Sequence, residues 1–154
     1  MKKFLTEAAI QEHTWENWKK WYDAFRPKTA LEPHDVQLIA MDENHMVLSM
    51  QMGEHAMQPY GLLHGGMSMM LAETAASVHA CWGVDLTKRV PVGIEINGSH
   101  LRSASEGTII TSAQIVRKSQ TLAHHTVEVR QKEGDRLLSV IRVTNLYKKL
   151  KQAN

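Results

Sequence analysis

Aromatic residues recur with a helical period near the start of the chain. Four of them stand three or four positions apart: Trp15, Trp18, Tyr22 and Phe25. This spacing predicts one apolar face of a helix, with Thr14 as a suitable N-cap and Pro27 ending it. Such a stripe is typical of packing against a core, and a lid over a ligand pocket is the alternative.

Six later segments predict β-strands. We expect them at residues 36–41, 45–52, 90–101, 108–118, 121–132 and 137–147. The last four are rich in Val, Ile and Thr, which favour strands. Turn-forming residues separate neighbouring segments at 42–44, 105–107 and 133–135.

The stretch that begins at Gly65 and stops before Gly83 predicts a single helix that is apolar on nearly every face, and its one acid is Glu73. A helix of this kind is usually buried. A buried carboxylate is costly unless another group pairs with it or uses it. A long apolar helix among antiparallel strands predicts an α+β fold in which the sheet wraps around the helix.

Length and composition fit one globular domain, because 43% of the 154 residues are apolar and 22% are charged. The net charge of +2 is too small to indicate a nucleic-acid partner. The one cysteine, Cys81, forms no internal disulfide, which fits a reducing compartment, and we expect a cytoplasmic protein. We expect no membrane partner, because no apolar run approaches about 18 residues and Glu7 and Glu12 interrupt any signal core after Lys2 and Lys3.

Gly65 and Gly66 stand at the expected start of the apolar helix. A helix start has unpaired backbone N–H groups and a partial positive charge, and glycine lets a ligand approach the backbone closely. The segment therefore offers two groups. The helix start can polarise a carbonyl, and Glu73 supplies an acid. The alternative is a core helix whose glutamate is simply paired, since buried ion pairs are also structural.

Two segments carry a resemblance to a known family. They are residues 61–66, Gly-Leu-Leu-His-Gly-Gly, followed by Glu73, and residues 93–104, Gly-Ile-Glu-Ile-Asn-Gly-Ser-His-Leu-Arg-Ser-Ala. With them the chain resembles the hotdog-fold acyl-CoA thioesterases, above all the subgroup of 1,4-dihydroxy-2-naphthoyl-CoA and 4-hydroxybenzoyl-CoA thioesterases, with phenylacetate-pathway thioesterases as near relatives. The likeness implies a hotdog thioesterase domain at 35–147, preceded by an amphipathic helical segment (1–34) and followed by a polar tail (148–154).

The resemblance implies roles for five residues around the thioester. Glu73 matches the catalytic carboxylate, acting as general base or nucleophile, and Gly65 matches the residue whose N–H binds the thioester carbonyl. Positions matching Gln58, His64 and Ser77 help to place the thioester or the attacking water. The alternatives for these three are a solvated loop glutamine, a histidine without catalytic duty and a serine bonded to the backbone one turn back.

Four further residues are expected to bind the substrate. The segment with His100 and Arg102 resembles a stretch that lies near bound CoA, and an arginine is suited to its phosphates. Met69 and Met70 offer an adaptable acyl pocket, with core packing as the alternative. Nothing in the sequence resembles a metal site, so we expect no metal and no cofactor, CoA being part of the substrate.

Gly65 and Glu73 are eight residues apart, which is about 12 Å along a helix. Reacting atoms must approach within about 3–3.5 Å of each other. One helix would struggle to place both groups on a single carbonyl. We therefore expect a homodimer, or a dimer of dimers, in which Gly65 comes from one subunit and Glu73 from the other.

Two other functions stay open beside an acyl-CoA thioesterase. A hotdog dehydratase also uses a helix carboxylate, but it pairs the carboxylate with a histidine in a differently composed loop. The second is a non-catalytic acyl-CoA-binding module, in which a buried acid would contribute little to the binding of an acyl chain. The sequence leaves aromatic and medium-chain acyl groups equally open.

Overall fold

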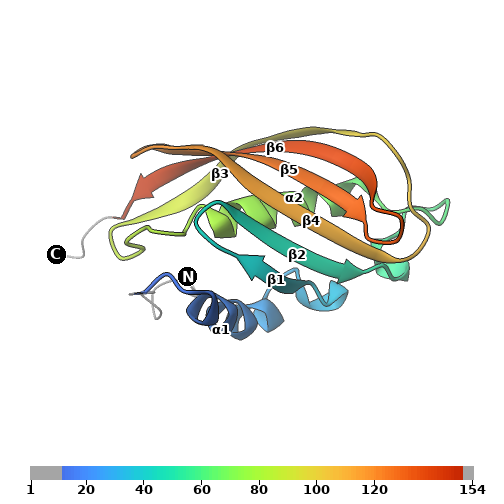
Figure 1. Ribbon diagram of the computed structural model, residues 1–154, viewed down its shortest axis with the longest axis horizontal. Helices are drawn as coiled ribbons and strands as arrows, with labels where there is room; N and C mark the ends of the chain where they lie inside the picture. Colours follow the sequence, from blue (N-terminus) through green and yellow to red (C-terminus); the bar gives the residue numbers. More distant parts are fainter. Residues whose placement is uncertain (1–11, 151–154) are drawn as a thin grey trace.

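The computed structural model describes residues 12–150 and contains one antiparallel sheet that curves around a long helix (Figure 1). The helices and short 3-10 turns are α1 (Trp15–Phe25), η1 (Arg26–Lys28), η2 (Glu32–His34), η3 (Glu54–Ala56) and α2 (Gly65–His79). The strands are β1 (Gln37–Met41), β2 (His45–Gln51), β3 (Arg89–His100), β4 (Thr108–Lys118), β5 (Leu122–Gln131) and β6 (Arg136–Lys149). They are ordered β1-β2-β4-β5-β6-β3, so β3 and β1 are the sheet edges. The expected α+β architecture, a sheet wrapped around one apolar helix, is confirmed.

The predicted strands agree with the observed ones to within two residues at each end. The largest difference is in β6, where Lys148 and Lys149 pair with β3 and so belong to the sheet instead of the expected polar tail. The rest of that tail, from residue 151, and residues 1–11 of the N-terminal segment lie outside the described residues. α2 ends at His79, and the chain then turns until Gly83, whose φ of +67° is the left-handed conformation that favours glycine.

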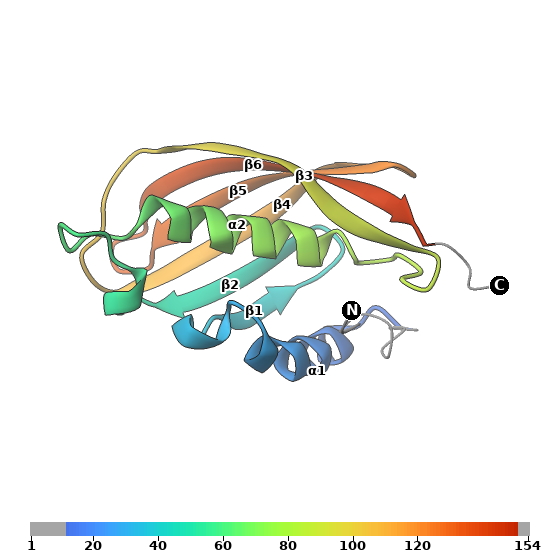
Figure 2. The same ribbon diagram turned by 180° about the vertical axis from the view of Figure 1, so that it is seen from behind.

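Helix α1 is part of the same hydrophobic core as the sheet (Figure 2). The Thr14 side chain caps it by accepting a hydrogen bond from the Asn17 N–H at 3.3 Å, as expected. Trp18 and Tyr22 are fully buried, and the Tyr22 hydroxyl donates to the Val36 carbonyl at 3.0 Å. The aromatic stripe therefore packs α1 onto the chain that leads into β1.

Helix α2 buries one face against the concave side of the sheet. The buried residues recur at steps of three and four and include several alanines, which let the helix approach the strands closely: Ser68, Leu71, Ala72, Ala75, Ala76 and His79. The expectation of a helix buried on every side, with a buried Glu73, is wrong for the single chain, where Glu73 is exposed. The reason is that the sheet covers α2 from one side only.

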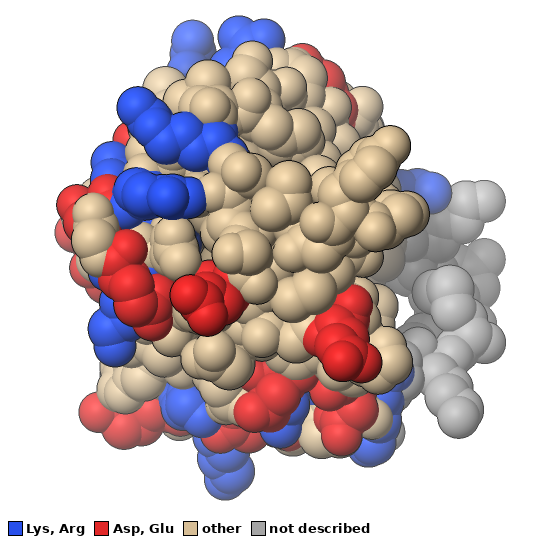
Figure 3. Space-filling view, turned by 90° about the vertical axis from the view of Figure 1, so that its right-hand side faces the viewer, with Lys and Arg blue, Asp and Glu red and all other residues tan. Residues whose placement is uncertain are grey.

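Among the described residues, no helix combines the length and the hydropathy needed to cross a membrane. Figure 3 views the molecule from one end and shows charged side chains of both signs around a broad uncharged area. This mixture of signs agrees with the small net charge of the chain.

Candidate active site

A first pocket of about 500 Å³ lies at the N-terminal end of α2. It brings together four of the residues that the sequence singles out: Gln58, Gly65, His100 and Arg102. They come from the loop before α2, the first turn of α2, the end of β3 and the loop after β3. Residues more than forty positions apart in the sequence thus line one cavity.

The first turn of α2 carries a backbone donor that the protein leaves free. His64 is the N-cap residue, and its ring Nδ1 accepts a hydrogen bond from the Gly66 N–H at 2.8 Å. For the Gly65 N–H, no acceptor occurs among residues 12–150. A free N–H at the positive end of a helix is suited to bind a carbonyl oxygen or another negatively polarised atom.

His100 explains why residue 65 is a glycine. A Cβ at Gly65 would lie 2.7 Å from the His100 Nε2, well inside contact distance. The His100 ring is held in this position because its Nδ1 is hydrogen-bonded to the Ser139 Oγ at 2.9 Å. Gln58, which lines the same pocket, is held as well, since its side-chain oxygen accepts from the Tyr60 N–H at 2.8 Å.

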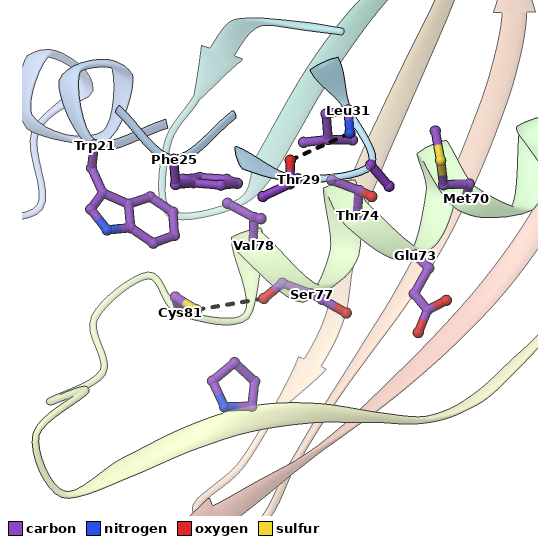
Figure 4. A pocket seen from close by; sticks show the side chains of 12 residues that line it. Trp21, Phe25, Thr29, Leu31, Met70, Glu73, Thr74, Ser77, Val78 and Cys81 are labelled. Atoms are coloured by element: carbon purple, nitrogen blue, oxygen red, sulfur yellow. Dashed lines mark hydrogen bonds between the residues drawn. The ribbon is translucent and has the colours of Figure 1, made fainter. Parts of the chain in front are cut away.

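A second pocket of about 410 Å³ contains Glu73, Ser77 and Met70 (Figure 4). It lies along the outer side of α2, whereas Gly65 belongs to the first pocket. Within one chain, the structure therefore does not bring the expected carbonyl-binding N–H and the expected carboxylate into one cavity. Met69 lines neither of these pockets and packs half-buried against the core, so Met70 is the only one of the two methionines that lines either pocket.

The sequence-based prediction missed two residues close to Glu73 and Ser77, namely Gly93 and Asn145. A Cβ at Gly93 in β3 would lie 2.8 Å from the Glu73 Oε1, so the missing side chain makes room for the carboxylate. Asn145 in β6 is fully buried and its Nδ2 donates to the Ser77 Oγ at 2.8 Å. Gly93 lies within the segment that carries the family resemblance, but nothing there marks it as a neighbour of Glu73.

The sequence contains one weak indication that Asn145 has a polar partner. Asn145 occupies an inward position of β6, in a row with three buried apolar residues: Ile141, Val143 and Tyr147. A polar residue in such a row needs a partner. The partner is Ser77, and the two positions are 68 residues apart in the sequence. The Ser77 oxygen accepts in this bond, and the alternative expected for Ser77, a bond from its hydroxyl to the backbone one turn back, does not occur within residues 12–150.

Two buried histidines lie away from both pockets. His79 Nε2 is 3.0 Å from the Asp42 carbonyl oxygen and donates to it, and the His79 Nδ1 then accepts from the His125 Nε2 at 2.8 Å. Burial lowers the pKa of His79 to about 4 and that of His125 to about 3, so both rings are neutral at pH 7. His79 is therefore a core histidine with a hydrogen-bond partner at each ring nitrogen. Within residues 12–150, no three His, Cys, Asp or Glu side chains are grouped to hold a metal ion.

Comparisons with known proteins agree with this architecture. The family model of the thioesterase superfamily matches residues 60–138. A 1,4-dihydroxy-2-naphthoyl-CoA hydrolase of Listeria monocytogenes is 29% identical over 114 residues, which cover 74% of this chain and 91% of that protein. The structure of thioesterase HI1161 of Haemophilus influenzae has a TM-score of 0.81 at 26% identity and covers 94% of this chain and 97% of that one.

The thioesterase SAV0944 of Staphylococcus aureus is similar as well. Its variant with a glutamine replaced by alanine has a TM-score of 0.74 at 30% identity and covers 77% of this chain and 97% of that one. In a second solved variant, alanine replaces a glutamate fifteen positions later. Because the family model covers more than half of this chain, from the loop before α2 into β6, the chain belongs to the thioesterase superfamily and is a thioester hydrolase of the hotdog fold.

Proposed function

We propose that the protein hydrolyses an acyl-CoA thioester to a free acid and CoA. The observation that carries the proposal is the free Gly65 N–H at the start of α2, combined with an exposed Glu73 on the same helix. The Listeria relative, which is named as a CoA-thioester hydrolase, supports the choice of CoA.

The Gly65 N–H binds the thioester carbonyl in this proposal. Attack on the carbonyl carbon builds negative charge on its oxygen, and one well-placed donor is worth roughly 10²–10³ in rate. The positive end of α2 adds to this stabilisation. His64 supports the geometry by capping the helix through Gly66, which keeps the Gly65 donor available.

Glu73 acts on the carbonyl carbon by one of two routes. As a general base it takes a proton from water while the water oxygen bonds to the acyl carbon, and the C–S bond then breaks to release the CoA thiolate, which is protonated. As a nucleophile its carboxylate oxygen bonds to the acyl carbon and expels the thiolate, and water then hydrolyses the resulting anhydride. In both routes Ser77 lies one helical turn from Glu73 and holds the carboxylate or the water.

Two copies of the chain form the complete site. Gly65 and Glu73 are both in α2, about 12 Å apart along its axis, and line different pockets. In a dimer this separation is no obstacle, because Glu73 of one copy lies next to Gly65 of the other. The edge strand β3 supports this arrangement, because Val92 and Ile94 on it are exposed apolar residues, and no other strand among residues 12–150 pairs with this edge. The assembly is a homodimer or a dimer of dimers.

The first pocket binds the CoA side of the thioester. Arg102 is placed to pair with a phosphate there, and His100 lies beside the Gly65 N–H. Gln58 orients the thioester or the water. The two Staphylococcus variants support roles for Gln58 and Glu73, which are also fifteen positions apart. The lone, buried Cys81 fits a reducing compartment, and we place the activity in the cytoplasm.

Thiol release from a panel of aromatic and aliphatic acyl-CoAs tests the proposal. We expect Glu73→Gln to lower kcat/KM by at least about 10², because the variant keeps the shape but loses the base or nucleophile. Glu43→Gln, in the exposed turn between β1 and β2, is the matched control and should behave as wild type. No thiol release from any thioester would favour a binding module, and hydration of an enoyl-CoA would favour a dehydratase.

A further inference from the structure

The pocket that contains Glu73 extends away from the carboxylate toward the N-terminal helix (Figure 4). Glu73 and Met70 lie at one end of the group of side chains, and Trp21 and Phe25 of α1 lie at the other. The two aromatic rings contact each other, with centroids 4.4 Å apart. Trp21 is only 8% exposed and Phe25 packs half-buried against the core, so the two rings form an apolar wall.

The space between these ends is apolar. Its walls include Leu31, Met70, Val78 and Pro91. The hydroxyl of Thr29, which also lines it, donates to the Arg26 carbonyl and accepts from the Leu31 N–H, so its hydrogen bonds are made within its own loop.

Glu73 is the charged side chain of this pocket, and no lysine or arginine lines it among the described residues. A second carboxylate placed there would lack a cationic partner and would be repelled by Glu73. The pocket is therefore suited to an uncharged group.

The length of the pocket limits the size of that group. Glu73 and Cys81 both line it and are eight residues apart along α2 and the turn that follows, which is about 12 Å. An extended chain advances about 1.2 Å per bond, as the backbone does with three bonds in about 3.6 Å. An unbranched chain of roughly eight to ten carbons thus reaches from the carboxylate to the aromatic wall.

We propose that this pocket binds the acyl group of the substrate, that the acyl group is an uncharged chain of medium length, and that Trp21 and Phe25 set its upper length. The inference rests on the proposed thioester hydrolysis, since it places the reacting carbon beside Glu73. It gives helix α1 a second function besides core packing, namely the end wall of the acyl site.

Binding of non-hydrolysable S-alkyl-CoA thioethers, from ethyl to hexadecyl, tests the inference by titration calorimetry. For wild type, we expect the affinity to rise by up to about fourfold with each added methylene, which is the value for a fully buried methylene. The rise should stop near the decyl thioether. In Trp21→Ala and Phe25→Ala, the rise should continue to longer chains. A thioether with a terminal carboxylate should bind more weakly than its methyl-ended counterpart by at least tenfold.

Trp15→Ala is the matched control, because Trp15 is on the same helix but does not line the pocket. Phe25→Leu serves where a larger truncation unfolds the protein, which circular dichroism reports. An unchanged length limit in folded variants of Trp21 and Phe25, or equal binding of the carboxylated thioether, overturns the inference. Thiol release measured in parallel separates the two proposals: length-dependent binding without hydrolysis contradicts only the hydrolytic function, and hydrolysis with an unchanged length limit contradicts only the pocket assignment.

Discussion

At the scale of single residues, Asn145 determines how its neighbour Ser77 is used. The Asn145 amide donates to the Ser77 oxygen, so the Ser77 hydroxyl proton is free to point elsewhere. Glu73, one turn earlier on the same helix face, is a suitable acceptor. We expect Asn145→Ala to lower kcat by about 3–10-fold with little change in KM, because the net value of one hydrogen bond is about 0.5–1.5 kcal/mol. Steady-state kinetics on the best acyl-CoA measure this change.

The double variant with Ser77→Ala shows whether Asn145 acts through Ser77. If it does, the two substitutions together cost little more than Ser77→Ala alone. Fully additive losses would mean that Asn145 acts independently of the serine. Asn97→Ala in β3, whose half-buried side chain is hydrogen-bonded to Arg142 instead of Ser77, is a control that should leave kcat unchanged.

At the scale of elements, the His79–His125 pair makes the contact between α2 and β5 sensitive to acid. The unfolded chain binds protons on both histidines near pH 6.5, whereas burial holds the folded-state pKa values at about 4 and about 3. At pH values between the folded-state and the unfolded-state pKa, the unfolded chain binds more protons than the folded protein. The free energy of unfolding therefore falls as the pH decreases. We expect the urea midpoint to fall steadily from pH 7 to pH 4.5.

His125→Gln isolates this effect, because it removes one titrating ring from the pair. Its urea midpoint should depend less steeply on pH than that of wild type. Thr126→Ser, which replaces a half-buried residue of the same strand without changing a titratable group, should keep the wild-type slope. Equal slopes for wild type and His125→Gln would contradict the assignment.

At the scale of the whole molecule, the proposed shared site predicts complementation between two inactive variants. Glu73→Ala lacks the carboxylate, and Gly65→Ala places a Cβ against the His100 ring beside the carbonyl-binding N–H. A mixed dimer has one intact site and one doubly defective site. Random re-association of equal amounts should therefore restore about a quarter of the wild-type thioesterase activity.

Subunit exchange is verified by mass spectrometry with one variant isotopically labelled. Recovery without exchange, or exchange without recovery, would contradict a site built from two copies. A mixture of Gly53→Ala with Glu73→Ala is the reference for a glycine substitution that leaves the site intact. A Cβ at Gly53 meets nothing within 4 Å.

The sequence by itself determined where the elements lie and which family the chain joins. Strand and helix periods are local properties of the backbone, so six strands and two helices could be placed to within a few residues. The glycine pair, Glu73 and the segment of residues 93–104 are also local, and they pointed to the thioesterases that the comparisons confirm. These signals need no knowledge of which segments meet.

Only the tertiary structure decided which side chains share a cavity. The exposure of Glu73 follows from the sheet covering one side of α2, and the hydrogen bond between Asn145 and Ser77 follows from packing α2 onto β6. The aromatic face of α1 indicated a helix, but its position beside the Glu73 pocket depends on contacts with segments some fifty residues away. The physical reason is that local periodicity fixes the face on which a residue lies, whereas strand register and packing fix what that face meets.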